Sequence, residues 1–414
     1  MSSPTTDGAP PRIYYLTEEF YPPQIGGVEL MVSYLSHGLA ARGIPTQVIT
    51  RQTTPPALPE ETIGSVRVRR IRPGGLLKGI GWRAVPAVVT YVCRLAFILL
   101  SEAARYDVVI ISGLKIIPLA AVPVCRLLGK RCIIRIESTF ELAEPLSAES
   151  RHSMGLMGRL LQGVLRRTQQ YVLRRAEPVV AISREVEGKL LDLGVASTRI
   201  ARIPNGIDLS RFHPVAADEK LRLRAQLSIP QQATVVLFAG RLSKAKGIVR
   251  LLELWPEIIA RHPRLHLVIV GGGAGSFDDC EAQLLDLIQR GQLQPHVTMA
   301  GVTDRVHSYL QAADVFMFPS LYEGFGLGII EALACGMIVA VTPVGVAEEL
   351  IQHGVNGFLF RADDSAAIAG AMDAVLTAED NWPAISRRAR AAIEPFDLNA
   401  IVGQYAALCQ TTRP

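Results

Sequence analysis

The sequence predicts an α/β protein built from two doubly wound, Rossmann-like domains that face each other across a central cleft. At 414 residues the chain is about twice the length of a usual domain. Short apolar runs alternate with helical patterns along its whole length, and this alternation is typical of parallel sheets buried on both faces. The composition, 49% hydrophobic and 20% charged, is that of a soluble globular protein.

Each half of the chain contains six apolar runs of strand length. The first six are Ile13–Leu16, Thr46–Thr50, Val66–Ile71, Val108–Ser112, Cys132–Glu137 and Val179–Ser183. The second six are Val235–Ala239, Leu265–Val270, Val297–Ala300, Val315–Pro319, Ile338–Val341 and Gly357–Phe360. Between the two series stands a turn-forming segment, Pro204–Asp208, followed by a polar stretch at 214–220, which marks a domain boundary. We therefore expect a disordered start at 1–11, domains at 12–205 and 206–395, and a C-terminal helix at 396–414 that packs back on the first domain.

The sequence predicts a cytoplasmic protein. No secretory signal opens the sequence, and the longest apolar stretch, Ala84–Leu100, is interrupted by Pro86 and Arg94, so we expect no membrane span. The six cysteines lack metal-ligand spacing and lie mostly in apolar runs, as reduced core residues do.

Positive charge is concentrated in the first half of the chain. Residues 1–203 hold 26 Lys and Arg against 16 Asp and Glu, whereas the remainder holds 17 against 22. Such a balance favours an anionic acceptor or an anionic membrane surface and gives no sign of nucleic acid as a partner. The densest part places basic residues at helical spacing among apolar ones: Arg159, Arg166, Arg167, Arg174 and Arg175 among Leu160, Leu161, Val164, Leu165 and Val172. Two interpretations stay open, a helix on the inner membrane face and a surface helix with its apolar stripe on the core.

The most informative segment runs from Glu323 to Glu331. A buried strand precedes it and a helix follows, so Glu323 lies on the strand-to-helix loop and Glu331 lies within the helix. Backbone N–H groups of Gly324, Phe325, Gly326 and Leu327 lie at the helix start, where the dipole favours an anion. Two carboxylates flanking such donors suit a nucleotide-sugar, which has hydroxyls at both ends and a diphosphate between them. The alternative is a helix cap and a solvated glutamate.

In each half of the chain, the loop that follows the first strand contains candidate ligand-binding residues. In the second half, Gly240 frees the backbone, and Arg241 and Lys246 bring two cations that suit a diphosphate. In the first half, Gly26 and Gly27 open a helix and let the backbone approach a ligand. The glycine run at 271–275 lacks the spacing of a dinucleotide fingerprint, which disfavours an NAD-dependent oxidoreductase.

These motifs, in this order, resemble the family-four retaining glycosyltransferases of the GT-B fold, and the resemblance covers nearly the whole chain from about residue 12. It rests on Gly26-Gly27-Val28-Glu29, Pro204 to Asp208, Gly240-Arg241-Leu242 with Lys246-Gly247, and Glu323 to Glu331 with Ala332 to Gly336.

The resemblance implies that the N-terminal domain binds the acceptor and the C-terminal domain binds a nucleoside-diphosphate sugar. Arg241 and Lys246 would hold the diphosphate, and Glu323 would contact the donor sugar together with Gly324 to Leu327. Glu331 would bind the ribose, and Gly26 and Gly27 would reach toward the phosphate. The reaction would retain configuration and need no metal and no cofactor beyond the sugar donor, with UDP-sugars favoured and GDP-mannose next. A saccharide, a lipid-linked saccharide and a small metabolite remain open as acceptors.

The chain departs from the family at one point. Many relatives carry a histidine after the fifth strand of the first domain, and here that strand ends in Glu137 and Ser138, with Glu141 and Glu144 nearby. We expect Glu137 to take part in catalysis by hydrogen bonding to sugar hydroxyls. Two other functions remain as alternatives, a sugar-nucleotide 2-epimerase and a non-catalytic sugar-nucleotide-binding protein.

Overall fold

The computed structural model describes residues 9–20, 26–52, 58–73, 85–143, 163, 166–273, 278–361 and 364–411. The chain forms two compact units. The first comprises Met1–Gly206 and Leu398–Pro414, and the second comprises Ile207–Asp397. The last helix, α15 (Leu398–Gln410), therefore belongs to the first unit. The segment expected to be a disordered start lies mostly outside the described residues.

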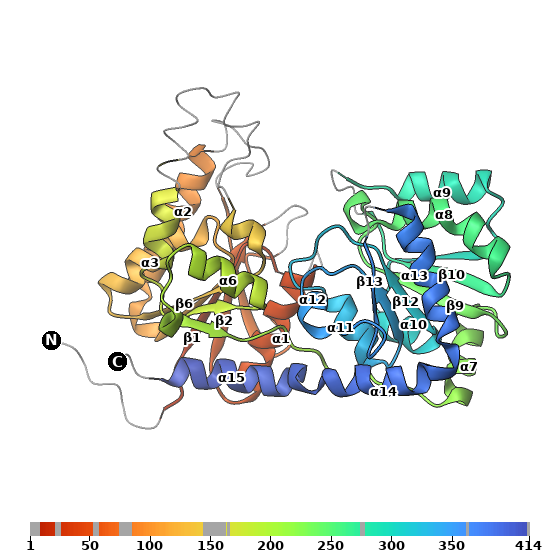
Figure 1. Cartoon of the computed structure of the whole chain (residues 1–414). Coiled ribbons are helices and arrows are strands. Elements are labelled where there is room, and N and C mark those ends of the chain that lie inside the picture. Colours follow the sequence, from red (N-terminus) through yellow and green to blue (C-terminus); the bar gives the residue numbers. More distant parts are fainter. Residues whose placement is uncertain are drawn as a thin grey trace. The chain divides into compact units, whose positions relative to one another are not determined.

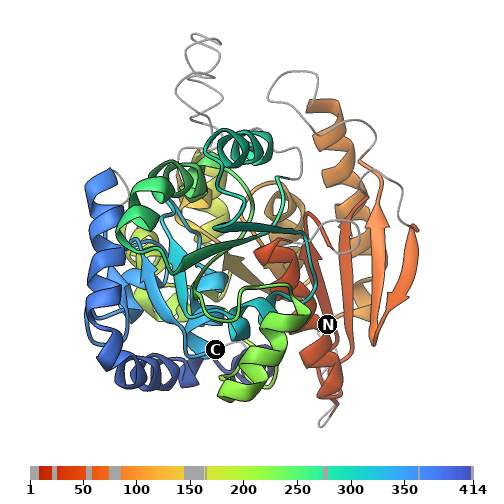
Figure 2. The ribbon, with the colours of Figure 1, turned by 90° about the vertical axis from the view of Figure 1, so that its right-hand side faces the viewer.

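The first unit is built on an eight-stranded sheet in the order β3-β4-β2-β1-β5-β6-β7-β8. Its strands are β1 (Ile13–Thr17), β2 (Thr46–Arg51), β3 (Glu60–Ile63), β4 (Val66–Ile71), β5 (Val108–Ser112), β6 (Arg131–Ile136), β7 (Val179–Ala181) and β8 (Ile200–Arg202). All six predicted strands are present and pair in parallel. Two strands were not predicted. β3 is an edge strand with little apolar character, and β8 has only three residues. The antiparallel pair of β3 and β4 forms the orange edge of the sheet in Figure 2.

The helices of the first unit form two layers. Among them are α1 (Gly27–Ala41), α2 (Val85–Ser101), α3 (Ile117–Leu127), α6 (Arg184–Asp192) and α15. Figure 1 shows α2 beside α3, while α1 packs closely on α15. A side chain at Gly38 would meet Val402 at 2.6 Å, so α15 lies firmly on this unit. Of the predicted basic helix, residues 166–173 are helical with Val172 and Leu173 buried, and most of the preceding part lies outside the described residues.

The second unit contains a six-stranded parallel sheet in the order β11-β10-β9-β12-β13-β14. Its strands are β9 (Thr234–Ala239), β10 (Leu265–Val270), β11 (Val297–Gly301), β12 (Val315–Phe318), β13 (Ile338–Val341) and β14 (Phe358–Leu359). Its helices are α7 (Ala217–Gln226), α8 (Ile248–Arg261), α9 (Glu281–Arg290), α10 (Val306–Ala312), α11 (Leu327–Ala334), α12 (Ala347–Leu350), α13 (Ser365–Thr377) and α14 (Trp382–Ala392). The six predicted strands and the doubly wound α/β class are confirmed.

Each sheet changes winding direction at one pair of strands, β1 and β5 in the first unit and β9 and β12 in the second. In open parallel sheets, ligands bind outside the carboxyl ends of the strands at this switch point. The topology therefore directs attention to the loops that follow β9 and β12, and to those that follow β1 and β5.

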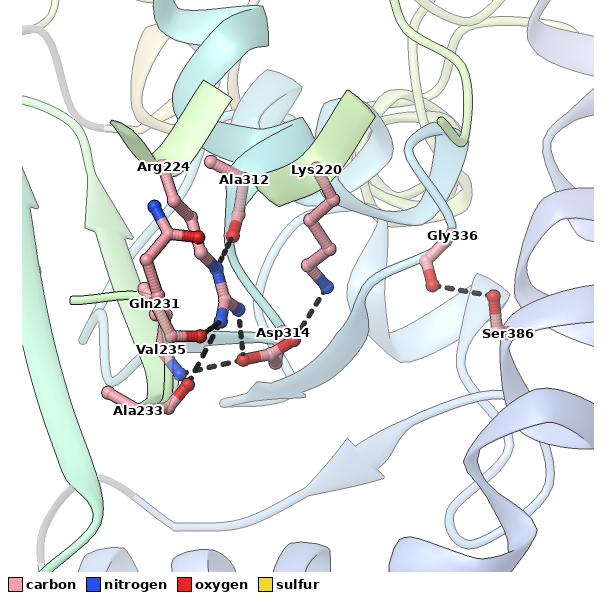
Figure 3. A network of polar contacts seen from close by, with 9 residues as sticks. All are labelled: Lys220, Arg224, Gln231, Ala233, Val235, Ala312, Asp314, Gly336 and Ser386. Atoms are coloured by element: carbon pink, nitrogen blue, oxygen red, sulfur yellow. Dashed lines mark hydrogen bonds and ion pairs between the residues drawn. The ribbon is translucent and has the colours of Figure 1, made fainter. Parts of the chain in front are cut away.

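A polar network fixes α7 to the opposite, amino edge of the second sheet (Figure 3). Asp314, which directly precedes β12, accepts hydrogen bonds from Arg224 at 2.6 Å, Lys220 at 2.5 Å and the backbone N–H of Val235 at 2.7 Å. The buried Arg224 guanidinium also donates to the carbonyls of Ala312, Gln231 and Ala233. Each of the three guanidinium nitrogens thus donates to an acceptor, which is what allows a guanidinium to be buried.

Within the described part of the chain, no helix is both long enough and apolar enough to cross a membrane. Five of the six cysteines are buried as expected, whereas Cys93 on α2 is exposed.

Candidate active site

The loops after β9 and β12 lie against each other at the switch point of the second sheet. Gly247 adopts a left-handed conformation, φ +73°, and a side chain there would meet the Pro319 carbonyl at 2.0 Å. The backbone N–H of Leu321 donates to the Ala245 carbonyl at 2.8 Å. Only glycine permits this close approach, and the approach brings the cationic loop next to the Glu323 loop.

Lys246 and Glu323 form an ion pair across the two loops. The Lys246 Nζ lies 2.7 Å from Glu323 Oε1 and donates to the Tyr322 carbonyl at 3.4 Å. It also lies 5.9 Å from the centre of the Phe318 ring. The structure therefore brings together two predicted site residues that are 77 positions apart in the sequence.

Arg241 is exposed at the carboxyl end of β9, on the same loop as Lys246. Its guanidinium makes no ion pair or hydrogen bond with any residue that the structure describes. A guanidinium that the fold does not use is available for an anion.

The start of α11 offers backbone donors to a ligand. Gly326 caps the helix in a left-handed conformation with φ +94°. The amides of Gly324, Phe325 and Gly326 donate no hydrogen bond to a described residue, while the Phe325 carbonyl accepts one from Val346 at 2.7 Å. Free N–H groups at the positive end of a helix favour an anion, and the structure places the start of the helix where the sequence predicted it.

Glu331 lies in the second turn of α11, and its carboxyl group has no hydrogen-bonding partner among the described residues. Burial raises the pKa of its carboxyl to about 7, against the opposing effect of the Arg211 charge. A carboxyl group with this pKa is partly protonated at neutral pH, so it can donate a hydrogen bond as well as accept one.

This raised pKa predicts a pH-dependent contribution of Glu331 to stability. A carboxyl whose pKa is higher in the folded state stabilises the fold fully below its unfolded pKa and loses that contribution as pH rises through the folded value. As pH rises from 5 to 8, we expect the free energy of unfolding of the parent protein to fall relative to that of Glu331→Gln, by at most about 3 kcal/mol. Urea unfolding of both proteins at the two pH values measures this change, and an equal difference at both would contradict it.

In the first unit, Gly26 and Gly27 stand at the start of α1, as the sequence predicted. Gly26 caps the helix, and the Glu29 carboxylate folds back over it, since a side chain at Gly26 would meet Glu29 Oε2 at 2.4 Å. These glycines therefore lie at the carboxyl end of β1, beside the switch point of the first sheet.

Glu137 follows β6 and is buried in an ion pair with Arg135. The fully buried Arg135 guanidinium also donates to the side-chain oxygen of Asn205, and the Tyr405 ring of α15 lies beside it. Sequence analysis missed this arrangement. The signal was a single arginine inside the apolar run 132–136, which a buried strand tolerates only when its charge is paired.

A second carboxylate, Glu141, lies next to Glu137. The backbone N–H of Glu137 donates to Glu141 Oε2 at 3.4 Å. Burial, strengthened by the Glu137 charge, raises the pKa of Glu141 to about 8. Burial also raises the pKa of Glu137, although the Arg135 charge opposes the shift. Glu141 is therefore largely neutral at pH 7, and Glu137 is the carboxyl group with a dedicated cation.

The structure brings the predicted residues together in two groups, one on each unit. Arg241, Lys246, Glu323 and the start of α11 gather in the second unit, and Gly26, Gly27 and Glu137 lie at the carboxyl edge of the first sheet. Among the residues that the structure describes, no group of three His, Cys, Asp or Glu side chains is placed to hold a metal ion.

Two family models match successive parts of the chain. The model of Glycosyltransferase Family 4 matches residues 25–211, and that of Glycosyl transferases group 1 matches residues 219–392. Among curated proteins, a D-inositol 3-phosphate glycosyltransferase of Xylanimonas cellulosilytica is 29% identical over 404 residues, which cover 90% of this chain and 88% of the relative. An enzyme of the same name from Kineococcus radiotolerans is 30% identical over 349 residues, 77% of this chain and 73% of the relative.

Solved structures show the same fold. Sucrose-phosphate synthase from Thermosynechococcus elongatus has a TM-score of 0.75 at 24% identity, with 96% of this chain and 98% of that chain covered. Anabaena HepE, solved in complex with UDP, has a TM-score of 0.72 at 22% identity and the same coverage. Each family model covers most of one of the two units, and the relatives are matched over most of their length. The chain thus belongs to glycosyltransferase family 4 and is a glycosyltransferase of the GT-B fold.

Proposed function

We propose that this enzyme transfers a sugar from a nucleoside-diphosphate sugar to an acceptor hydroxyl, with retention of configuration and without a metal ion. The observation that carries the proposal is the meeting of Arg241, the Lys246–Glu323 pair and the free amides of the α11 start at one switch point. This set offers two cations and several N–H donors for a diphosphate, next to a carboxylate for sugar hydroxyls. A UDP-sugar is the favoured donor and GDP-mannose the next. HepE, whose fold this chain shares, was solved with UDP.

The chemistry follows from these groups. The bond between the sugar C1 and the diphosphate oxygen breaks, and the nucleoside diphosphate leaves with the electron pair. Arg241, Lys246 and the helix-start amides stabilise its growing negative charge more strongly in the transition state than in the bound donor. The acceptor oxygen bonds to C1 on the same face, and its proton passes to the departing diphosphate. No cofactor takes part, since the donor sugar already carries its leaving group.

The carboxyl edge of the first sheet favours an acceptor without negative charge. Glu18, Glu29, Glu137 and Glu141 stand there or in the adjoining loop and helix starts. Their mutual repulsion contributes to the raised pKa values of Glu137 and Glu141. Among the described residues of this edge, Lys115 is 3.9 Å from Glu18 and Arg135 is committed to Glu137. A phosphate placed here would add to the repulsion, whereas hydroxyl groups would find acceptors. We therefore place an uncharged saccharide or polyol ahead of an inositol phosphate.

Turnover tests the proposal. UDP-glucose, UDP-galactose, UDP-N-acetylglucosamine and GDP-mannose are each incubated with neutral saccharides, myo-inositol and D-inositol 3-phosphate, with EDTA present. We expect acceptor-dependent release of one nucleoside diphosphate, and NMR of the product shows whether the anomeric configuration is retained. Epimerised donor without acceptor would establish the 2-epimerase alternative, and donor binding without turnover would establish the non-catalytic one. Efficient use of D-inositol 3-phosphate alone would refute the uncharged acceptor.

Glu137 is the residue proposed to hydrogen-bond to sugar hydroxyls on the acceptor side. We expect Glu137→Gln to lower kcat about tenfold, as the loss of one charge-assisted hydrogen bond does. The matched control is Glu141→Gln, which resembles the neutral carboxyl group that Glu141 already carries at pH 7 and should leave kcat nearly unchanged. Steady-state kinetics below the melting temperature of each variant measures both. Unchanged kcat and KM for both substrates in Glu137→Gln would remove Glu137 from the site.

A further inference from the structure

Four arginines converge at the amino edge of the first sheet, the edge opposite to Glu137. Arg126 lies in the last turn of α3, before β6. Arg174 and Arg175 precede β7, and Arg199 ends a short 3-10 helix before β8. In a parallel sheet every helix-to-strand connection reaches the same edge. These side chains line one cavity of about 500 Å³ together with Glu177.

Three of the four guanidinium groups have no counterion within the described part of the chain. The guanidinium groups of Arg126, Arg174 and Arg175 make no ion pair or hydrogen bond with residues that the structure describes, and that of Arg175 makes a cation–π contact with Tyr171 at 5.7 Å. Other cationic side chains at the same edge do have partners. Arg12 pairs with Asp107 at 2.9 Å, and Lys130 donates to the Tyr106 carbonyl at 2.7 Å.

Arg199 is the fixed member of the cluster. Its guanidinium donates to the carbonyls of Leu173 and Ala176, and its Nε lies 3.9 Å from Glu177. These bonds hold one guanidinium in the wall of the cavity and tie it to the segment that carries Arg174 and Arg175. One carboxylate thus faces four guanidinium groups, and like charges gathered in one cavity repel one another. A helix dipole accounts for a cation in the last turn of α3, but it does not account for the other three.

We propose that Arg126, Arg174, Arg175 and Arg199 bind a phosphate group at this edge. Guanidinium groups bind phosphate in a bidentate manner, and several of them around one cavity match its multiple oxygens. The cavity is large enough for a phosphate ester. Its place at the amino edge separates it from the catalytic groups, so its ligand is an effector or an anchor and not a substrate. The phosphate belongs either to a soluble ester or to the headgroup of an anionic lipid.

Calorimetric titration with inorganic phosphate tests the site, with UDP saturating the donor site so that the two cannot be confused. We expect phosphate to bind the parent protein and to bind Arg174→Ala/Arg175→Ala at least tenfold more weakly. The matched control is Arg387→Ala/Arg388→Ala, an adjacent pair of exposed arginines on α14, which should bind phosphate as the parent does.

Cosedimentation with phosphatidylglycerol vesicles, against phosphatidylcholine vesicles, tests the second source. Phosphate binding that the Arg174/Arg175 variant loses supports a soluble ligand, and vesicle binding that the same variant loses supports a lipid headgroup. The proposal would be overturned if the parent protein bound neither phosphate nor vesicles, or if the Arg174/Arg175 variant bound them as the parent does. The melting-temperature shift produced by UDP is recorded for each protein, so that a failure of this site is distinguishable from a failure of the donor site.

Discussion

Replacing Arg241 by alanine should lower kcat/KM for the donor by about 10²- to 10³-fold, the size of effect seen when one group that stabilises transition-state charge is removed. The side chain makes no interaction with the described part of the fold, so we expect the melting temperature without ligand to stay unchanged. A loss of activity with unchanged stability would therefore mean that Arg241 acts on the donor diphosphate and not on the fold.

Lys246→Ala should lower kcat/KM to a similar degree and should also disturb its loop. It removes the cation that lies 2.7 Å from Glu323, and it leaves that carboxylate unpaired beside an anionic donor. The matched control is Lys244→Ala, an exposed lysine in the same 3-10 turn (Lys244–Lys246). Steady-state kinetics and thermal unfolding of the three variants provide the comparison. Equal losses in Lys244→Ala and Lys246→Ala would mean that the loop supplies only general positive charge.

The largest effect on stability is expected at Asp314. Its carboxylate accepts hydrogen bonds from Arg224, Lys220 and the Val235 backbone (Figure 3), and Asp314→Ala leaves the buried Arg224 charge without its partner. Breaking a buried ion pair from one side costs about 3–5 kcal/mol. We expect a fall of that size in the free energy of unfolding of the second unit, measured by urea denaturation.

The control for Asp314 is Asp218→Ala. Asp218 also pairs with an arginine, Arg222, at 2.8 Å on α7, but both side chains are exposed. Exposed pairs of this kind contribute about 0.5 kcal/mol. If the two variants lost equal stability, the Asp314 network would be no more than a surface ion pair.

The strands of both sheets other than β3 and β8 could be predicted from the sequence, because a short apolar run between turns is typical of a buried strand. The same local logic placed a glycine-rich turn around Gly326, where the backbone adopts a left-handed conformation. It failed for β3, whose Glu-Glu-Thr-Ile pattern gives no apolar signal, since an edge strand is stabilised mainly by its neighbour β4.

The partners of charged side chains could not be predicted. Glu137 was recognised as a departure from the family pattern, but its ion pair with Arg135 and the link to Asn205 depend on how β6 meets a segment 70 residues away. The sequence likewise showed an excess of basic residues in the first half without showing that four of them share one cavity at the amino edge.

The sequence alone determined the two-sheet α/β class, the GT-B resemblance and the set of candidate donor-site residues, because each depends on short-range order: strand period, glycine at tight turns and motif spacing. Only the tertiary structure decided which of these residues touch. It joined Lys246 to Glu323, left the Arg241 guanidinium without a partner among the described residues, and buried Glu331 far enough to raise its pKa to about 7. The reason is physical: an ion pair or a pKa shift depends on distance and burial in space, which packing sets between segments that the linear order keeps far apart.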